Sequence, residues 1–286
     1  MSTAEFTIRG RPDLKDWQEK VRDGLRGRFH AFARAIFGAP DAEKLVFSLI
    51  KYGPRATSLR VSEGETHVFL KLFDKTGEAP AAYVRERSAL IALRNSGLVP
   101  RLIGFDDEVC FVATEFVDGQ PLDDPELKMS PIEQAYRLGE WTASLDCRSP
   151  ARRASGTWLN YLSKFEDSLA FDVLGDVADI LADVPLCGLA MSHGDAALHN
   201  FMLDADNQLI ACDFEAARMR PRGWDFMMTY LALLTRYPDA GGNVVSAFAD
   251  GFDHYHRGAL ITDELIRVAR IIYCARALSD TGREEG

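Results

Sequence analysis

The hydrophobic pattern of this chain is mainly strand-like over 44–119 and mainly helix-like beyond it, and this division limits the fold more than any other feature. The first part contains β-branched and aromatic runs typical of short strands, at 44–53 and 58–73. A helical pattern covers 79–97, and strand patterns return over 98–119. Beyond 117–130 the pattern is mainly helical. We therefore expect an α+β chain in two lobes that meet within that last range.

The acidic composition bears on partners and location. The chain has 43 acidic and 33 basic residues and a net charge of −10, which disfavours nucleic acid as a partner. Its five cysteines are odd in number and mostly in apolar surroundings, so we expect reduced core thiols. The N-terminus lacks an apolar signal core and no apolar run is long enough for a membrane span. We expect a cytoplasmic protein with no membrane partner.

A group of polar side chains interrupts the helical half between Ser192 and Glu215. Two apolar segments within it, NFML and LIAC, favour a hairpin, which brings its two ends together. Asp195 and Asn200 precede the first strand and Asp213 ends the second, so two carboxylates and one amide oxygen are expected to converge. Oxygen ligands suit a hard divalent cation, and magnesium fits better than zinc.

The order of these residues resembles a kinase catalytic loop, in which an Asp orients the acceptor hydroxyl, an Asn binds metal and a second Asp begins a D-F-x triplet. Here the motif is His193-Gly194-Asp195 through Asn200, then Asp213-Phe214-Glu215. Gly after the His and Glu after the Phe are similar to the aminoglycoside phosphotransferase and choline kinase-like family. The resemblance covers about residues 45–235.

This resemblance implies a fold and an activity. The fold is the two-lobed protein kinase-like fold, with a small β-rich N-lobe and a larger, mainly helical C-lobe. The activity is phosphorylation of a hydroxyl group on a small molecule, with ATP and Mg²⁺ as cofactors. Asp195 is expected to orient and deprotonate the acceptor, Asn200 and Asp213 to bind the metal, and Glu215 to support the metal through water.

Further matches lie upstream. A kinase needs a strand lysine for the α and β phosphates and a helix glutamate to hold that lysine. Lys71 in HVFLKLF and Glu86 in YVRERSAL have that order, and helical phase places Glu86 on an apolar face. The stretch ATEFVDGQPL is similar to the hinge of the family, whose backbone meets the adenine edge, and this suggests Glu115 and Val117.

The expected division of the chain has three parts. Apolar residues recur at steps of three and four over 14–37, which predicts an amphipathic helix. We assign 1–40 to an N-terminal helical extension, 41–118 to a nucleotide-binding N-lobe and 119–286 to a C-lobe that carries catalysis and substrate binding.

Two segments depart from the family pattern. The phosphate-covering turn, KYGPRATSLRV, has one glycine and a proline and lacks a glycine-rich loop, so we expect the amides around Thr57 and Ser58 to cradle phosphate. A helix ends in Leu145-Asp146 where many relatives carry Leu-His.

Three residues near the motif have alternative interpretations. His193 is expected to brace a turn. His199 completes an H-x-D-x-x-x-H pattern with metal donors, but nothing elsewhere supplies a second set of ligands. Asp225 follows Trp224 and either begins a helix near its positive end or, by family analogy, hydrogen-bonds the catalytic-loop backbone.

The acceptor and the class of activity leave alternatives open. Four aspartates form an acidic stripe over 172–183, which is either a solvated helix face or an attraction for a cationic acceptor such as an aminoglycoside, choline or an amino alcohol. A protein kinase is one alternative, although the short segment between Asp213 and Trp224 leaves little room for an activation segment. The other is a non-catalytic, nucleotide-sensing kinase-like module.

Overall fold

The computed structural model describes residues 45–162, 184–237 and 241–256, with single positions at 37, 182, 263 and 266. Apart from Phe37, the predicted helix over 14–37 lies outside the described residues, and so do the four aspartates of the acidic stripe. In the described part of the chain, no helix is both long enough and apolar enough to cross a membrane.

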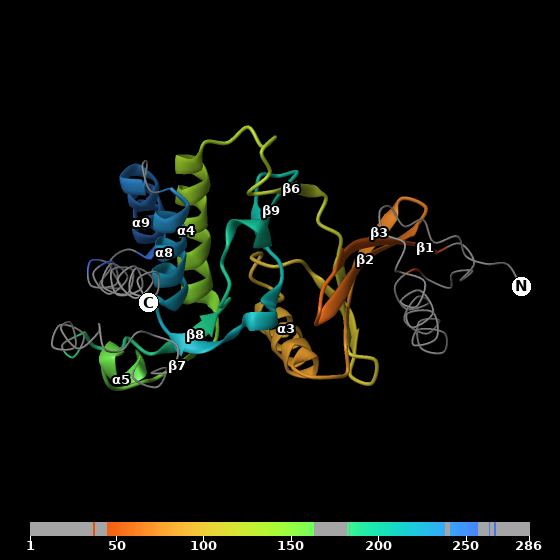
Figure 1. Ribbon diagram of the computed structural model, residues 1–286, viewed down its shortest axis with the longest axis horizontal. Coiled ribbons are helices and arrows are strands. Elements are labelled where there is room, and N and C mark those ends of the chain that lie inside the picture. Colours follow the sequence, from red (N-terminus) through yellow and green to blue (C-terminus); the bar gives the residue numbers. More distant parts are fainter. Residues whose placement is uncertain are drawn as a thin grey trace, which may run out of the picture. The chain divides into compact units, whose positions relative to one another are not determined.

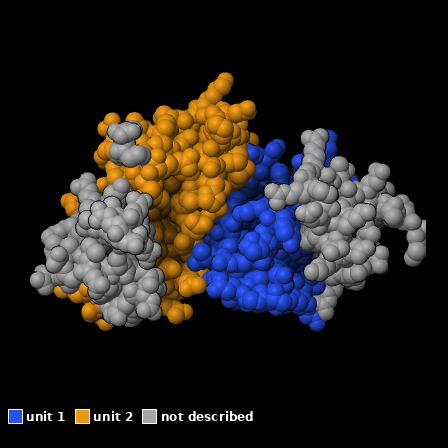
Figure 2. All heavy atoms as spheres, in the orientation of Figure 1, with its two compact units in different colours: residues 1–119, 212–216 blue, residues 120–211, 217–286 orange. Residues whose placement is uncertain are grey.

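The chain forms two compact units, shown in blue and orange in Figure 2. Unit 1 comprises residues 1–119 with 212–216, and unit 2 comprises residues 120–211 with 217–286. The Asp213-Phe214-Glu215 triplet therefore packs with the strand-rich unit, although it follows the hairpin of the helical unit in sequence.

Unit 1 is built on an antiparallel five-stranded sheet (Figure 1). Its strands in spatial order are β1 (Val46–Tyr52), β2 (Ala56–Glu63), β3 (Thr66–Phe73), β5 (Phe111–Glu115) and β4 (Leu102–Asp106). Alternate residues point to one face, so Leu59 and Val61 of β2 and Val68 and Leu70 of β3 share a buried core. The strand pattern of the sequence thus yields one packed sheet.

Helix α3 (Ala79–Leu93) packs beside this sheet. Proline at position 80 suits its first turn, where the missing amide has no helical acceptor. Ala82, Glu86, Ala89 and Leu93 recur at steps of three and four on its buried side. The short 3₁₀ segment η6 (Phe214–Ala216) contacts the same helix.

Unit 2 is mainly helical. Its helices among the described residues are α4 (Pro131–Arg148), α5 (Trp158–Leu162), α8 (Trp224–Arg236) and α9 (Gly241–His256). Ser130 caps α4, because its side chain accepts a hydrogen bond from the Glu133 amide at 3.2 Å. Helices α4 and α9 pack closely at glycines: a Cβ on Gly139 would lie 2.1 Å from the carbonyl oxygen of Phe248.

The described part of unit 2 also contains two small sheets. One has the order β10 (Leu209–Ala211), β9 (Phe201–Asp204), β6 (Gly119–Pro121), and the other has the order β11 (Arg218–Pro221), β8 (Leu189–Ser192), β7 (Ala151–Arg152). Strands β9 and β10 are the hairpin that the sequence predicts, and they pair antiparallel with Phe201 opposite Ala211. This hairpin separates the 195–200 loop from the triplet that follows it.

The cysteines only partly match expectation. Cys110, Cys147, Cys187 and Cys212 are free thiols, but Cys147 and Cys187 are exposed, so the prediction of core thiols is wrong for these two. Cys147 lies in the last turn of α4 and Cys187 in the coil before β8, where apolar neighbours in sequence do not cover them. Burial raises the pKa of Cys212 to about 12.

Candidate active site

A buried ion pair joins the sheet and the helix of unit 1. Lys71 lies on β3 and Glu86 on α3, and the Lys71 Nζ donates to Glu86 Oε2 at 2.6 Å. Both residues are 5% exposed. The structure therefore brings together the lysine and the glutamate that the resemblance to kinases pairs, in surroundings where an unpaired charge is costly.

Asp213 is the second carboxylate on this lysine. The Lys71 Nζ donates to Asp213 Oδ1 at 2.6 Å, and Glu215 Oε2 lies 3.6 Å from the same nitrogen. Asp213 has a φ of 66°, in the left-handed region that few non-glycine residues adopt. Arg85, next to Glu86 on α3, donates to the Glu215 carbonyl oxygen and so fastens the triplet to the helix.

The charges of this cluster shift its pKa values. Burial lowers the pKa of Lys71, but the carboxylates of Glu86 and Asp213 outweigh burial, so the pKa of Lys71 is raised and its ammonium stays protonated. Burial raises the pKa of Glu86, and the neighbouring Lys71 opposes this effect. The lysine is therefore a permanent cation, which suits a group that binds phosphate.

Asn200 and Asp195 are tied together within unit 2. Asn200 ends the 3₁₀ turn η5 (Leu198–Asn200), is buried, and donates from Nδ2 to the Asp195 carbonyl oxygen at 2.8 Å and to Asp195 Oδ2 at 3.2 Å. These bonds orient the amide so that the Asn200 Oδ1 remains as an acceptor. Asp195 itself is exposed.

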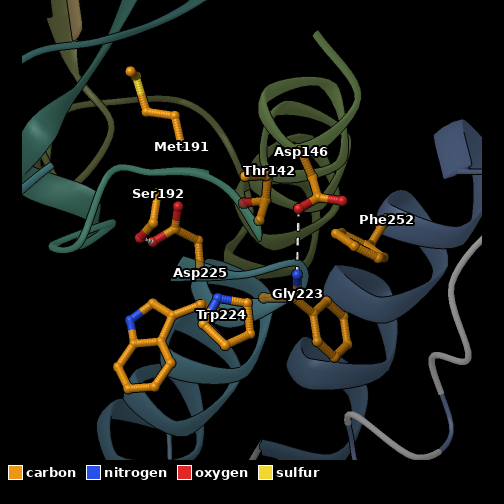
Figure 3. A pocket seen from close by; sticks show the side chains of 11 residues that line it. Thr142, Asp146, Met191, Ser192, Gly223, Trp224, Asp225 and Phe252 are labelled. Atoms are coloured by element: carbon orange, nitrogen blue, oxygen red, sulfur yellow. Dashed lines mark hydrogen bonds between the residues drawn. The ribbon is translucent and has the colours of Figure 1, made fainter. Parts of the chain in front are cut away.

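Asp225 holds the loop that carries Asp195. Its Oδ1 accepts from the Ser192 hydroxyl at 2.7 Å and from the Gly194 amide at 3.0 Å, and its Oδ2 accepts from the His193 amide at 2.7 Å. Figure 3 shows Ser192 and Asp225 facing each other beside a small pocket. The family-based expectation for Asp225, a hydrogen bond to the loop backbone, is met. Gly194 has a φ of 81°, a conformation that favours glycine.

His193 is placed to brace this turn. Its ring is fully buried, lies against Trp141 and Phe201, and its Nδ1 accepts from the Asp195 amide at 3.3 Å. His199 is exposed on the same loop. Among the residues that the structure describes, no group of three or more His, Cys, Asp or Glu side chains is arranged to hold a metal ion.

A second buried carboxylate lies at the same pocket. Asp146 accepts from Arg222 Nε at 3.0 Å. It also accepts from the Gly223 amide at 3.3 Å (Figure 3). It thus fastens the start of α8, the helix that carries Asp225. Asp146 is a visible departure from the family pattern in the sequence, but its partner Arg222, 76 residues away, cannot be recognised there.

The predicted hinge follows β5. Glu115 is the last residue of that strand, its amide donates to the Arg101 carbonyl oxygen at 2.9 Å, and its carbonyl oxygen accepts from the Thr114 hydroxyl at 3.1 Å. Val117 lies in the coil beyond it. Since a carbonyl oxygen has two lone pairs, that of Glu115 can accept a second hydrogen bond.

The expectation for Thr57 and Ser58 is wrong. Strand β2 begins at Ala56, and both residues pair with β1 on one side and β3 on the other, so their amides face the sheet ladder rather than a ligand. Arg55, which the sequence pattern does not single out, also belongs to the ion cluster of unit 1, because its Nη1 lies 3.0 Å from Glu215 Oε1. The sequence does show a cation, Arg55, directly after Gly53-Pro54. It does not show that the partner of Arg55 is Glu215, 160 residues away.

Together, the five-stranded sheet, the buried Lys71–Glu86 pair and the braced loop define a kinase-like phosphotransferase. The model of the phosphotransferase enzyme family matches residues 53–261, most of the chain. The chain belongs to this family, and it is a small-molecule kinase, as the sequence predicts. A search of the curated proteins finds no match.

Solved structures share the fold. Choline kinase LicA from Streptococcus pneumoniae is 13% identical with a TM-score of 0.61, and the match covers 94% of this chain and 92% of that one. The ethanolamine kinase of Plasmodium vivax is 15% identical with a TM-score of 0.58, covering 93% and 86%. A mutant of aminoglycoside phosphotransferase APH(4)-Ia, in complex with AMP-PNP and hygromycin B, is 11% identical with a TM-score of 0.52, covering 86% and 98%. The predicted α+β protein kinase-like fold is confirmed.

Proposed function

We propose that the protein is an ATP- and Mg²⁺-dependent kinase that phosphorylates a hydroxyl group of a small molecule. The cluster of Lys71, Glu86 and Asp213 carries this proposal, because a permanent cation held between two carboxylates is the phosphate-binding arrangement of kinases. The complex of APH(4)-Ia with AMP-PNP supports ATP as the donor.

The donor atoms fit magnesium. Mg²⁺ is typically held by one or two protein oxygens together with substrate phosphates, rather than by a cage of protein ligands. The Asn200 Oδ1, left as an acceptor by the bonds of its Nδ2, and the Asp213 carboxylate are such oxygens. Bound there, the ion would offset the charge of the phosphates, and Glu215 would support it through water.

Each remaining residue has one role in this proposal. Lys71 holds the α and β phosphates and Glu86 positions Lys71. Asp195, exposed and tied to Asn200, orients the acceptor hydroxyl and takes its proton. The backbone of Glu115 and Val117 meets the adenine edge.

This proposal also divides the chain. Residues 41–118 form the nucleotide-binding N-lobe, 119–286 the lobe for catalysis and substrate, and 1–40 an N-terminal extension. Residues 212–216 belong to the same compact unit as the N-lobe residues 41–118. This supports a nucleotide site built from both of these segments.

The acceptor is proposed to be a cationic small molecule, such as an aminoglycoside, choline or an amino alcohol. The net charge of −10 favours a cation, and proteins of similar fold include choline, ethanolamine and aminoglycoside kinases. A protein kinase is disfavoured because strand β11 (Arg218–Pro221) occupies part of the short segment between Asp213 and Trp224.

A screen of these compounds with ATP labelled on its γ phosphate tests the function, and Asp195→Asn tests the site. We expect this variant to bind nucleotide like wild type and to lose on the order of a hundredfold or more in turnover, since a positioned base contributes about that much. Asp206→Asn, a change on the exposed β9–β10 turn, is the matched control. Full turnover of Asp195→Asn would refute the assignment, and nucleotide binding without transfer by wild type would favour a sensing module. Transfer to a peptide array alone would favour a protein kinase.

A further inference from the structure

The turn between β1 and β2 has little backbone to offer a phosphate group. The Gly53 amide donates to the Ala56 carbonyl oxygen at 3.0 Å, and Pro54 has no amide hydrogen. The Arg55 carbonyl oxygen accepts from the Asp74 amide at 2.9 Å, which fixes the turn to the end of β3. A glycine-rich loop works through amides that point at the ligand, and this turn does not provide a row of them.

Two cationic side chains, those of Lys51 and Arg55, lie at and beside this turn. Arg55 Nη1 is 3.0 Å from Glu215 Oε1, and Lys51 Nζ is 3.9 Å from Asp213 Oδ2. Both carboxylates also face Lys71, the proposed phosphate-binding lysine, at 3.6 Å and 2.6 Å respectively. Three cations, from β1, from the β1–β2 turn and from β3, therefore surround one pair of carboxylates within unit 1.

The contacts of Arg55 and Lys51 are of a kind that exchanges readily. Their side chains are 45% and 67% exposed, against 7% for Lys71, and exposed ion pairs contribute little to stability. The other partner of Arg55, Glu78, is 77% exposed, with its Oε2 at 3.3 Å from Arg55 Nη2. A phosphate group carries more charge than a carboxylate and matches the two-pronged guanidinium, so it competes well for Arg55.

We propose that Arg55, assisted by Lys51, is a phosphate-binding residue of the nucleotide site and supplies the charge that a glycine-rich loop supplies through amides. The guanidinium leaves Glu215 and Glu78 and binds phosphate oxygens when a nucleotide enters. This inference rests on the proposed function, because it assumes that the phosphates lie beside Lys71 and Asp213. It predicts that Arg55 strengthens the binding of ATP by contacting its phosphates, and that Arg55 has no effect on the binding of the adenine base.

Calorimetric titration of the full chain with ATP and with adenosine separates these contributions. For Arg55→Gln we expect ATP to bind about tenfold more weakly, which corresponds to about 1.4 kcal/mol, and adenosine to bind unchanged. Arg55→Lys should recover part of the loss, and Lys51→Gln combined with Arg55→Gln should increase it. Lys75→Gln, which removes an exposed charge from the loop between β3 and α3, is the control for net charge.

A second titration, with EDTA in place of Mg²⁺, distinguishes direct binding from an effect through Glu215. If Arg55 contacts phosphate, Arg55→Gln weakens ATP binding with and without the metal. A loss that disappears in EDTA, or an equal loss for adenosine, would overturn the inference, because Arg55 would then only position Glu215 or the turn. Should wild type bind no ATP in either buffer, the proposed function fails first. Should wild type bind ATP and Arg55→Gln bind it equally well, only the present inference fails.

Discussion

Removal of the buried lysine gives the sharpest test of the ion cluster. In Lys71→Met the side chain keeps its length but loses its charge, so Glu86, 5% exposed, is left as a buried carboxylate without its cation. Breaking a buried ion pair from one side typically costs about 3–5 kcal/mol. Asp213 adds less to this cost because 26% of its side chain is exposed and can be hydrated.

A double variant separates the loss of the pair from the burial of an unpaired charge. Lys71→Met with Glu86→Leu removes both charges and fills the space with apolar atoms, and such replacements are often neutral or stabilising. We expect the double variant to lie within about 1–2 kcal/mol of wild type in its free energy of unfolding, and therefore to be more stable than Lys71→Met alone.

Hydrogen exchange is the suitable assay because it reports unit 1 directly. The amides of β3 pair with β2 and β5, so their exchange measures opening of this sheet, while urea denaturation followed by circular dichroism reports the whole chain. The exchange of β3 should be fastest in Lys71→Met. A cost below about 1 kcal/mol for Lys71→Met, or a double variant no more stable than the single one, would refute the reasoning.

The same variant should depend on pH in a stated direction. Burial raises the pKa of Glu86 above its unfolded value, and in Lys71→Met no ammonium opposes this. A group with a raised folded pKa contributes stability at low pH and loses it as the pH rises through that pKa. The cost of Lys71→Met should therefore be larger at about pH 8 than at about pH 5. An equal cost at both pH values would show that Glu86 is not the source of the penalty.

Two further predictions concern unit 2. Asp225→Ala leaves the Ser192 hydroxyl and the His193 and Gly194 amides without their acceptor. We therefore expect the free energy of unfolding, measured by urea denaturation, to fall by about 3 kcal/mol, and turnover to fall as well. Asp250→Ala, on the exposed side of α9, is the neutral control. Gly251→Ala places a Cβ 2.1 Å from the Tyr136 carbonyl oxygen and should lower the free energy of unfolding by about 1–3 kcal/mol. In Gly242→Ala, on the same helix, the added Cβ meets nothing within 4 Å, so this variant should be neutral or slightly stabilising. Equal melting temperatures for the two glycine variants would contradict the close packing of α4 and α9.

Local patterns in the sequence predicted much of this architecture. The resemblance to kinases pairs Lys71 with Glu86, and their order along the chain and the helical phase of Glu86 support that pairing. The hairpin of β9 and β10 was visible as two apolar runs separated by turn residues. The structural role of Asp225, hydrogen bonds to the loop backbone, is the one that the family resemblance implies.

Contacts between distant segments could not be predicted in the same way. Arg55 and Glu215 are 160 residues apart. A periodic pattern in the sequence describes local structure only, so it cannot predict that the turn before β2 contacts the triplet after β10. The error on Thr57 and Ser58 has a related cause. The expected phosphate-covering turn includes Thr57 and Ser58, but β2 begins at Ala56 and contains both residues. Strand ends are the least certain feature of a sequence pattern. Asp146 and Arg222 likewise meet only after the chain has folded.

The charge balance of the cluster relates the two proposals. Three cations, Lys51, Arg55 and Lys71, form ion pairs there with four carboxylates, which leaves these described groups with one negative charge in excess. Without a metal such a site would bind a triphosphate more weakly, since Asp213 and Glu215 would face the phosphate oxygens. A divalent cation held by Asp213 would reverse the sign of the balance and would weaken the hold of one carboxylate on Lys71. Metal and nucleotide would therefore favour each other's binding. Arg55, whose ion pairs with Glu78 and Glu215 are exposed or partly exposed, would exchange to phosphate with or without the metal.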